Sequence, residues 1–257
     1  MKQLKFQFPA FSITCLILIF TTASQNKPKT TIFYPGTGNE GFAVMELFTS
    51  QGCSSCPAAD NLLGKYAARR NEHIIPLAFH VDYWNRLGWT DSFSSAKYSR
   101  RQRDYAMIID HSSVYTPQLI INGEKEFVGS DAAMISEAIT DAVKEKPVIA
   151  ISIQKIERAG KNISVNYKLD KILKNLTLQA ALVQKQVFTN ILKGENRGLK
   201  LINYNVVRDL NSNPVSSSAS AITLNIPPGY NDKDFEVVLY IQDDASGKII
   251  AAIKSSF

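Results

Sequence analysis

The first half of the chain alternates short apolar runs with segments of helical periodicity. Residues 42–48 form a nearly continuous apolar run, which predicts a buried strand, and from residue 58 the apolar positions take up helical spacing to about residue 70. Residues 74–84 predict a second buried strand. A helix between two apolar strands favours a right-handed β–α–β unit, so we expect an α/β fold here.

The rest of this half continues with mixed elements. Residues 94–109 predict one or two helices rich in Arg, Tyr and Ala. The pair Asn122-Gly123 separates two short apolar runs, which is a strong signal for a β-hairpin. Residues 132–143 then have the spacing of a final helix.

Beyond Pro147 the pattern changes to alternation of apolar and polar positions, the period of half-buried strands. A series of short strands predicts an all-β, sandwich-like domain. We expect them at 148–156, 163–169, 176–187, 203–210, 221–226, 235–241 and 249–253. The connection 193–208 is basic and rich in Asn; we expect an ordinary loop there, with partner binding or folding over the thiols Cys53 and Cys56 as alternatives.

The N-terminus has the pattern of a secretory signal. Two lysines precede the apolar stretch 6–20, and small residues follow, with cleavage expected near Ala23. The stretch is short for a membrane span, so we expect no stable span after cleavage and an extracytoplasmic location, periplasmic or secreted. The predicted organisation is a signal peptide, a linker or irregular arm, an α/β domain and a sandwich-like domain, at 1–24, 25–40, 41–146 and 147–257.

Charge gives little sign of a nucleic-acid partner. Loss of the signal removes two lysines and no acid, so the formal charge falls from +6 to +4. The densest basic cluster, Arg100, Arg101 and Arg103, alternates with polar residues in a predicted helix, which favours a solvated face. We therefore expect no nucleic-acid binding.

Cys53 and Cys56 form a C-x-x-C pair at the junction of a predicted strand and helix. The free amides and positive dipole end of a helix N-terminus favour a thiolate over a thiol, so a lowered pKa is expected for Cys53. Cys15 lies in the predicted signal, which leaves only this pair in the mature chain. We predict that Cys53 is the exposed nucleophile and that Cys56 resolves the mixed disulfide with a protein substrate.

Two residues are candidates for proton transfer. Glu46 lies inside the first predicted strand, where an inward side chain would sit beneath the thiols, although an outward orientation is as compatible with the pattern. His80 ends the second strand and shares a face with Asp82 and Trp84. A structural, hydrogen-bonded histidine is the simpler interpretation of His80.

Three other interpretations of the thiol pair stay open. A disulfide closing so short a loop adds only about 2 kcal/mol of stability, which argues against a purely structural bridge. The two cysteines with His80 or His111 would suit Cu(I), although only the cysteines are adjacent in sequence. A binding module with inert thiols is the third. No glycine-rich phosphate loop or second cysteine pair is present in the sequence, so we predict no cofactor and no bound metal.

The order strand, thiol turn, helix, strand, Thr-Pro, hairpin and helix resembles the thioredoxin superfamily over residues 41–146. The resemblance implies that Pro117 is a cis-proline facing the thiols and that the backbone of Thr116 binds substrate. It also implies protein thiols or disulfides as substrates and a separate redox partner.

A narrower set of motifs resembles the family called domain of unknown function 1223, whose members are exported and thioredoxin-like. The motifs are ELFTSQGCSSCP at 46–57, HVDYW at 80–84, GW at 88–89, QR at 102–103, YTPQ at 115–118, GS at 129–130, GENRG at 194–198 and NVVR at 205–208.

Overall fold

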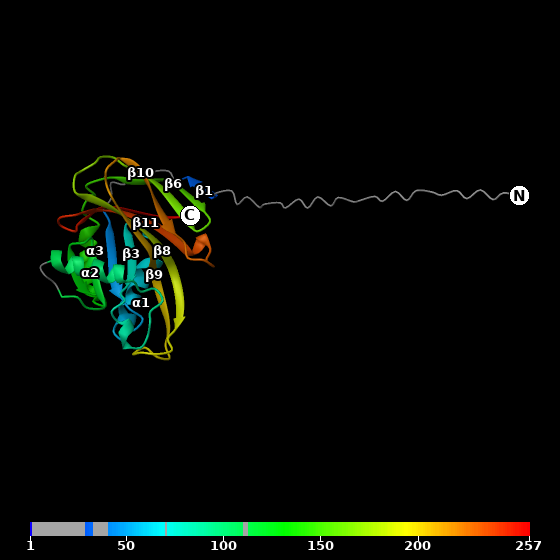
Figure 1. The fold of residues 1–257 in the computed structure, drawn as a ribbon. Helices are drawn as coiled ribbons and strands as arrows, with labels where there is room; N and C mark the ends of the chain where they lie inside the picture. The colour runs from blue at the N-terminus through cyan, green and yellow to red at the C-terminus, as the bar shows by residue number, and fades with distance from the viewer. Residues whose placement is uncertain (2–28, 33–40, 70, 110–112) are drawn as a thin grey trace.

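The computed structural model describes residue 1 and residues 29–32, 41–69, 71–109 and 113–257 (Figure 1). The predicted signal peptide and much of the predicted arm lie outside the described residues. Within the described ranges, no helix is long and apolar enough to span a bilayer.

A mixed sheet of eight strands forms the centre of the molecule, in the order β12-β11-β8-β9-β3-β2-β4-β5. Its strands from the first half are β2 (Ala43–Thr49), β3 (Ile74–His80), β4 (Gln118–Ile121) and β5 (Lys125–Val128). Its strands from the second half are β8 (Leu176–Asn190), β9 (Lys200–Pro214), β11 (Phe235–Asp243) and β12 (Ile249–Ser256). The two groups meet where β3 pairs in parallel with β9, Ala78 opposite Val206.

The sheet therefore runs across the boundary we predicted between residues 146 and 147. The structure shows a mixed α/β sheet with flanking helices and a β-rich region, while the division into two domains stays a prediction. Residues 81–84 are not part of the second strand as we expected, because the chain turns after His80 toward a short 3₁₀ helix, Asn85–Leu87.

Helices cover both faces of the first-half strands. Helices α1 (Cys56–Ala68) and α3 (Ala132–Ala142) pack on the face that carries Met45 and Leu47. Helix α2 (Ala96–Ile108) packs on the opposite face, on an aromatic cluster around Phe48. Pro57 and the caps Ser95 and Asp131 begin these helices where the sequence favours a start.

A second sheet, β1-β6-β7-β10, packs on the β8 and β11 side of the large sheet through a cluster of aliphatic side chains. Its strands are β1 (Lys29–Ile32), β6 (Ile151–Ala159), β7 (Asn162–Leu169) and β10 (Ala219–Asn225). Part of the predicted irregular arm is thus a strand, β1, paired antiparallel with β6. The strand β1 satisfies backbone hydrogen-bonding groups at the edge of β6. Hydrophobic periodicity does not reveal such edge pairing, so the strand could not be predicted from the sequence pattern.

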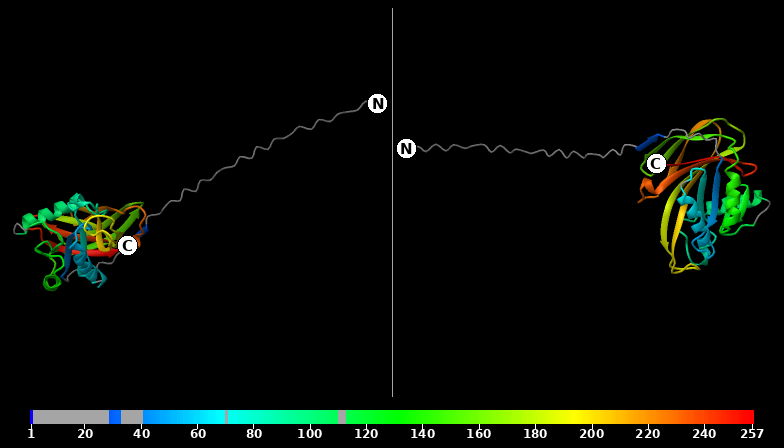
Figure 2. Two further views of the ribbon diagram at one scale, coloured as in Figure 1. Left: turned by 90° about the horizontal axis from the view of Figure 1, so that it is seen from below. Right: turned by 180° about the vertical axis from the view of Figure 1, so that it is seen from behind.

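The hairpin β8–β9 is longer than predicted. Both strands have 15 residues and continue to the end of the molecule at which α1 begins (Figures 1 and 2). The hairpin lies against α1, where Tyr204 contacts Gly64 so closely that a Cβ there would be 2.5 Å from the ring. This length brings the β8–β9 connection to the thiol turn.

Candidate functional site

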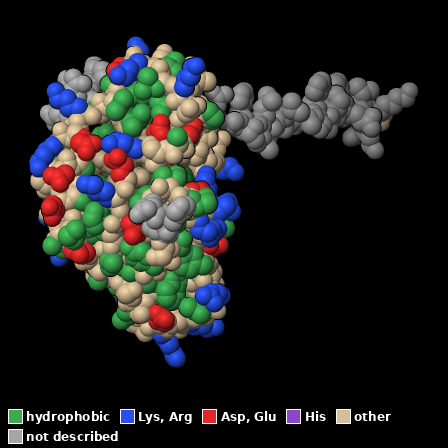
Figure 3. All heavy atoms as spheres, turned by 90° about the vertical axis from the view of Figure 1, so that its left-hand side faces the viewer, with side chains coloured by type: hydrophobic (Ala, Val, Ile, Leu, Met, Phe, Trp, Pro, Cys, Tyr) green, Lys and Arg blue, Asp and Glu red, His purple; other side chains and the backbone are tan. Residues whose placement is uncertain are grey.

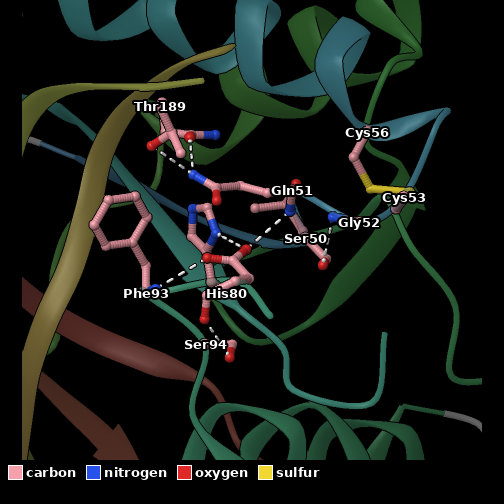
Figure 4. Close-up of polar contacts among 12 residues, drawn as sticks. Ser50, Gln51, Gly52, Cys53, Cys56, His80, Phe93, Ser94 and Thr189 are labelled. Carbon is pink, nitrogen blue, oxygen red and sulfur yellow. Dashed lines mark hydrogen bonds and ion pairs between the residues drawn. A yellow bond between two sulfur atoms is a disulfide. The ribbon is translucent and has the colours of Figure 1, made fainter. Parts of the chain in front are cut away.

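The two cysteines are joined by a disulfide at the start of α1, immediately after β2 (Figure 4). Two backbone hydrogen bonds shape the turn: the amide of Cys53 donates to the carbonyl of Ser50 at 3.2 Å, and that of Cys56 to the carbonyl of Cys53 at 3.3 Å. The pair therefore lies at the strand-to-helix junction that the sequence predicts. There, unpaired helix amides favour negative charge on sulfur once the bond is reduced.

Neither cysteine is exposed. Cys53 and Cys56 both have 0% of their surface accessible, whereas Ser54 and Ser55 between them are exposed. Our expectation of an exposed Cys53 is wrong for this oxidised state, because a segment distant in sequence covers the turn.

That segment is the β8–β9 connection, residues 191–199, which we call the cover loop. The side-chain amide of Asn196 donates to the carbonyl oxygens of Gln51 and Cys53, each at 2.9 Å. The carboxylate of Glu195 accepts from the backbone amide of Ser54 at 3.0 Å. The expectation of an ordinary loop is therefore wrong, and the alternative of folding over the thiol site is confirmed.

A buried carboxyl lies one helical turn after Cys56. Oδ2 of Asp60 accepts from Oγ1 of Thr49 at 3.2 Å and from Nδ2 of Asn203 at 3.4 Å, while Oδ1 has no partner among the described residues. Burial raises the pKa of Asp60 to about 7, although nearby His80 and the Thr49 hydroxyl act in the opposite direction. Residues four apart share a helix face, so Asp60 lies on the Cys56 side of α1.

His80 is buried beside this carboxyl and is bound to a second one. Its Nδ1 lies 2.6 Å from Oδ2 of Asp91, and both side chains are fully buried. Burial opposes protonation of His80, but Asp91 outweighs it and the pKa of His80 is raised. Burial likewise disfavours the charged form of Asp91, but His80 and two backbone amides outweigh it and lower the pKa of Asp91. Nε2 of His80 has no partner among the described residues.

Gln51 connects the thiol turn to this pair and to the second half of the chain (Figure 4). Its backbone amide donates to Oδ2 of Asp91 at 2.8 Å. Its side-chain amide donates to Thr189 and Asn203, each at 3.0 Å, and its oxygen accepts from Nε1 of Trp89 at 3.2 Å. Strands β8 and β9 thus supply part of the site, although we found no chemistry in the second half from sequence.

Four residues of the site were not among those predicted from sequence: Asp60, Asp91, Asn196 and Asn203. Asp60 had a local signal, since it is an acid among the apolar positions 59, 62 and 63 at the start of the predicted helix, and Asn196 lies in the GENRG motif of the connection 193–208. The others reach the site through pairings distant in sequence.

Glu46 does not lie beneath the thiols. It is fully buried on the α2 face of the sheet, where Arg101 donates to its two oxygens at 2.8 and 3.0 Å. The hydroxyl of Tyr240 donates at 3.1 Å, and that of Tyr105 also contacts the carboxylate. Strand alternation places it opposite the side chains that meet α1, so a proton exchange with Cys56 has no support in its contacts.

The Thr116–Pro117 peptide bond is cis, as the resemblance implied. A Cβ on Gly129 would lie 3.1 Å from both Ala59 and Pro117, which places Pro117 beside the first turn of α1. Oγ1 of Thr116 accepts from Nε1 of Trp84 at 2.7 Å, which holds the loop next to the thiol turn.

The copper interpretation has no ligand set in the described part of the chain. No three His, Cys, Asp or Glu side chains there are grouped closely enough to hold a metal ion. His80 is engaged with Asp91, and His111 lies outside the described residues.

Comparisons with known proteins give a family and a fold. A family model described as a protein of unknown function, DUF1223, matches residues 44–242. The chain is 30% identical to a thioredoxin of Methanocaldococcus jannaschii over 102 residues, which is 40% of this chain and 93% of that protein.

Two solved structures resemble most of the chain. The crystal structure of protein AGR_C_4864 from Agrobacterium tumefaciens is similar with a TM-score of 0.63 and 28% identity, over 83% of this chain and 92% of that one. HBP35 of Porphyromonas gingivalis shares the fold, with a TM-score of 0.58 and 15% identity over 85% of this chain and 76% of that one.

Proposed function

This chain belongs to the DUF1223 family, and from that membership and the site geometry we propose that it is an extracytoplasmic thiol–disulfide oxidoreductase. One observation carries the proposal: the Cys53–Cys56 disulfide lies at a helix N-terminus, next to a cis-proline and one helical turn from a buried carboxyl. A short-loop bridge adds little stability, so this arrangement fits redox chemistry better than reinforcement.

In the reducing direction, the Cys53 thiolate attacks one sulfur of a substrate disulfide. A bond forms between Cys53 and that sulfur, and the other substrate sulfur leaves as a thiolate. The Cys56 thiolate then attacks Cys53 and releases the second substrate thiolate, so the substrate is reduced and the Cys53–Cys56 disulfide forms. The oxidising direction is the reverse, and a dithiol or disulfide partner protein restores the starting state.

Asp60 is our candidate for the proton transfer that the second step requires. Its carboxylate takes the proton from the Cys56 thiol, and a pKa of about 7 suits a group that must both accept and release a proton near neutrality. His80 is a positioning residue in this scheme: it holds Asp91, which in turn binds the backbone amide of Gln51 in the thiol turn.

Substrate binding is assigned to Thr116 and Pro117. Their loop lies at the first turn of α1, and Trp84 holds it there. An extended substrate chain would pair with the Thr116 backbone, which brings its own cysteine to the thiol turn. The location outside the cytoplasm rests on the N-terminal signal pattern alone.

The burial of both cysteines favours one other candidate, a binding module with an inert bridge. The reduction potential of the mature protein, measured against glutathione mixtures, separates the two. We expect a value between about −120 and −270 mV, the range of working oxidoreductases, whereas a value below about −300 mV would favour the inert bridge. Cys53→Ser should abolish reduction of a disulfide-bonded protein, and Ser54→Ala, at an exposed position between the cysteines, serves as the matched control.

A further inference from the structure

We infer that the outer side of the cover loop, with the adjoining residues 86–87, is a docking surface for polypeptides that carry apolar and acidic side chains beside their reactive cysteine. This inference rests on the proposed function and names its substrate class. The surface, which we call the docking face, comprises Arg86, Leu87, Leu192, Lys193, Arg197 and Leu199.

Three leucines give the docking face its apolar character. Leu192 is 69% exposed, Leu199 48% and Leu87 47%. The backbone brings the segments that carry them together: the amide of Ile191 donates to the carbonyl of Leu199 at 2.9 Å, and a Cβ on Gly194 would lie 3.1 Å from Trp89 and 3.9 Å from the Leu87 carbonyl. Single exposed leucines are common, but a group beside a reactive disulfide marks a contact surface.

The charge of the docking face indicates which side chains its partner carries. Arg86, Lys193 and Arg197 are exposed around the leucines. The one nearby acid on the loop, Glu195, points its carboxylate to the backbone amide of Ser54 and so faces the thiol turn. Figure 3 shows blue Lys and Arg side chains at the lower end of the molecule, where the β8–β9 connection lies in Figure 1. This excess of positive charge favours a partner with acidic side chains.

Most of the docking face belongs to the same loop that binds the backbone of the thiol turn. Asn196 lies within the loop and its amide holds the carbonyls of Gln51 and Cys53. Because Cys53 has no exposed surface, a substrate sulfur reaches it only when the segments around the thiol turn, the cover loop among them, move. A polypeptide bound to the neighbouring residues can use its binding energy to move the loop, whereas a small disulfide lacks these contacts.

The chain supplies a matched control surface. Lys171, Ile172, Leu173 and Lys174 are also exposed, with similar composition, but they precede β8, whereas the cover loop follows it. A strand of 15 residues separates the two by about 50 Å.

The test compares two peptides with the fully reduced mature protein. Each has one cysteine as a mixed disulfide with a small neutral thiol, flanked by leucine and either aspartate or lysine. We expect at least a tenfold higher second-order rate constant for reduction of the acidic peptide at low salt, decreasing as ionic strength rises. Lys193→Glu with Arg197→Glu should reverse the preference, and Leu192→Ser with Leu199→Ser should lower the rate constant for both peptides about tenfold.

The controls are Lys171→Glu with Lys174→Glu and Ile172→Ser with Leu173→Ser, which should leave the peptide rates unchanged. The rate constant for reduction of the neutral hydroxyethyl disulfide should stay within twofold in every variant. If the wild type reduces neither peptide, the proposed function fails and this inference with it. If it reduces the peptides, but peptide charge makes no difference or the control variants change the rates equally, only the docking face is refuted.

Discussion

Two carboxylates are buried on opposite faces of the same sheet, and their surroundings differ completely. Glu46, on the α2 face, has a guanidinium and two tyrosine hydroxyls around its oxygens. Asp60, on the α1 side, has only the Thr49 hydroxyl and the Asn203 amide, and its second oxygen has no partner among the described residues.

The difference shows what a buried acid is suited to do. Glu46 on β2 is bound by the Arg101 guanidinium of α2 and the Tyr240 hydroxyl of β11, so this carboxylate joins the two halves of the chain. A carboxyl without a cation in contact is the group that exchanges a proton, and Asp60 has the pKa for it, about 7. From sequence, Glu46 and His80 were the two candidates for that role; the contacts favour Asp60.

The strongest test of the comparison is Arg101→Met. This change leaves Glu46 buried without its cation and should lower the free energy of unfolding by about 3–5 kcal/mol, measured by urea denaturation. Adding Glu46→Gln to Arg101→Met should restore part of the loss. Arg103→Met on the exposed side of α2 should change stability little; an equal loss in both single variants would contradict a special role for the pair.

Asp60→Asn should change how stability depends on pH. The pKa of Asp60 is raised from its ordinary value of 3.8 to about 7, so between these pH values the folded state binds more protons than the unfolded state. The Asp60 carboxyl therefore makes its full contribution to the free energy of unfolding below pH 4, and this contribution is lost as pH rises through 7. At about 1.4 kcal/mol per pKa unit, the loss amounts to about 4 kcal/mol. In urea denaturation measured from pH 4 to 8, the free energy of unfolding of the variant should no longer fall with rising pH in this way. If it falls as in the wild type, the raised pKa does not belong to Asp60.

The same variant should slow the second chemical step. Without a carboxylate to take the Cys56 proton, resolution of a Cys53 mixed disulfide should be about a hundredfold slower at pH 7. Single-turnover measurements across pH 5 to 9 would follow this step, and the wild-type rate should rise with a midpoint near the Asp60 pKa. Identical profiles for the two proteins would exclude Asp60 from proton transfer.

The smallest expected effect is that of Thr49→Val. The Thr49 hydroxyl donates to Asp60 and lowers the pKa of that carboxyl, so its removal should raise the pKa by about one unit. The carboxyl carbon signal in an NMR titration measures this shift. Thr140→Val removes a hydroxyl that binds the Ser136 carbonyl on the exposed side of α3, and the Asp60 midpoint should not move.

Most of the elements, and the position of the thiol pair, could be predicted from sequence because they depend on local patterns. Periodicity predicted the strands and helices, and the spacing of Cys53 and Cys56 before a helix predicted their disulfide-forming geometry. The orientation of Glu46 could not be predicted, because β2 is buried on both faces and its apolar run shows no alternation.

The covered, two-sided site was decided by tertiary structure alone. Asn196 and Asn203 reach the thiol turn only because β9 pairs with β3 and because the β8–β9 hairpin extends to the start of α1. Such pairings join residues more than 100 positions apart, where hydrogen bonding and burial in the whole sheet select the partner. The sequence by itself thus determined which residues can carry redox chemistry, and the tertiary structure decided which acid lies beside them and what covers them.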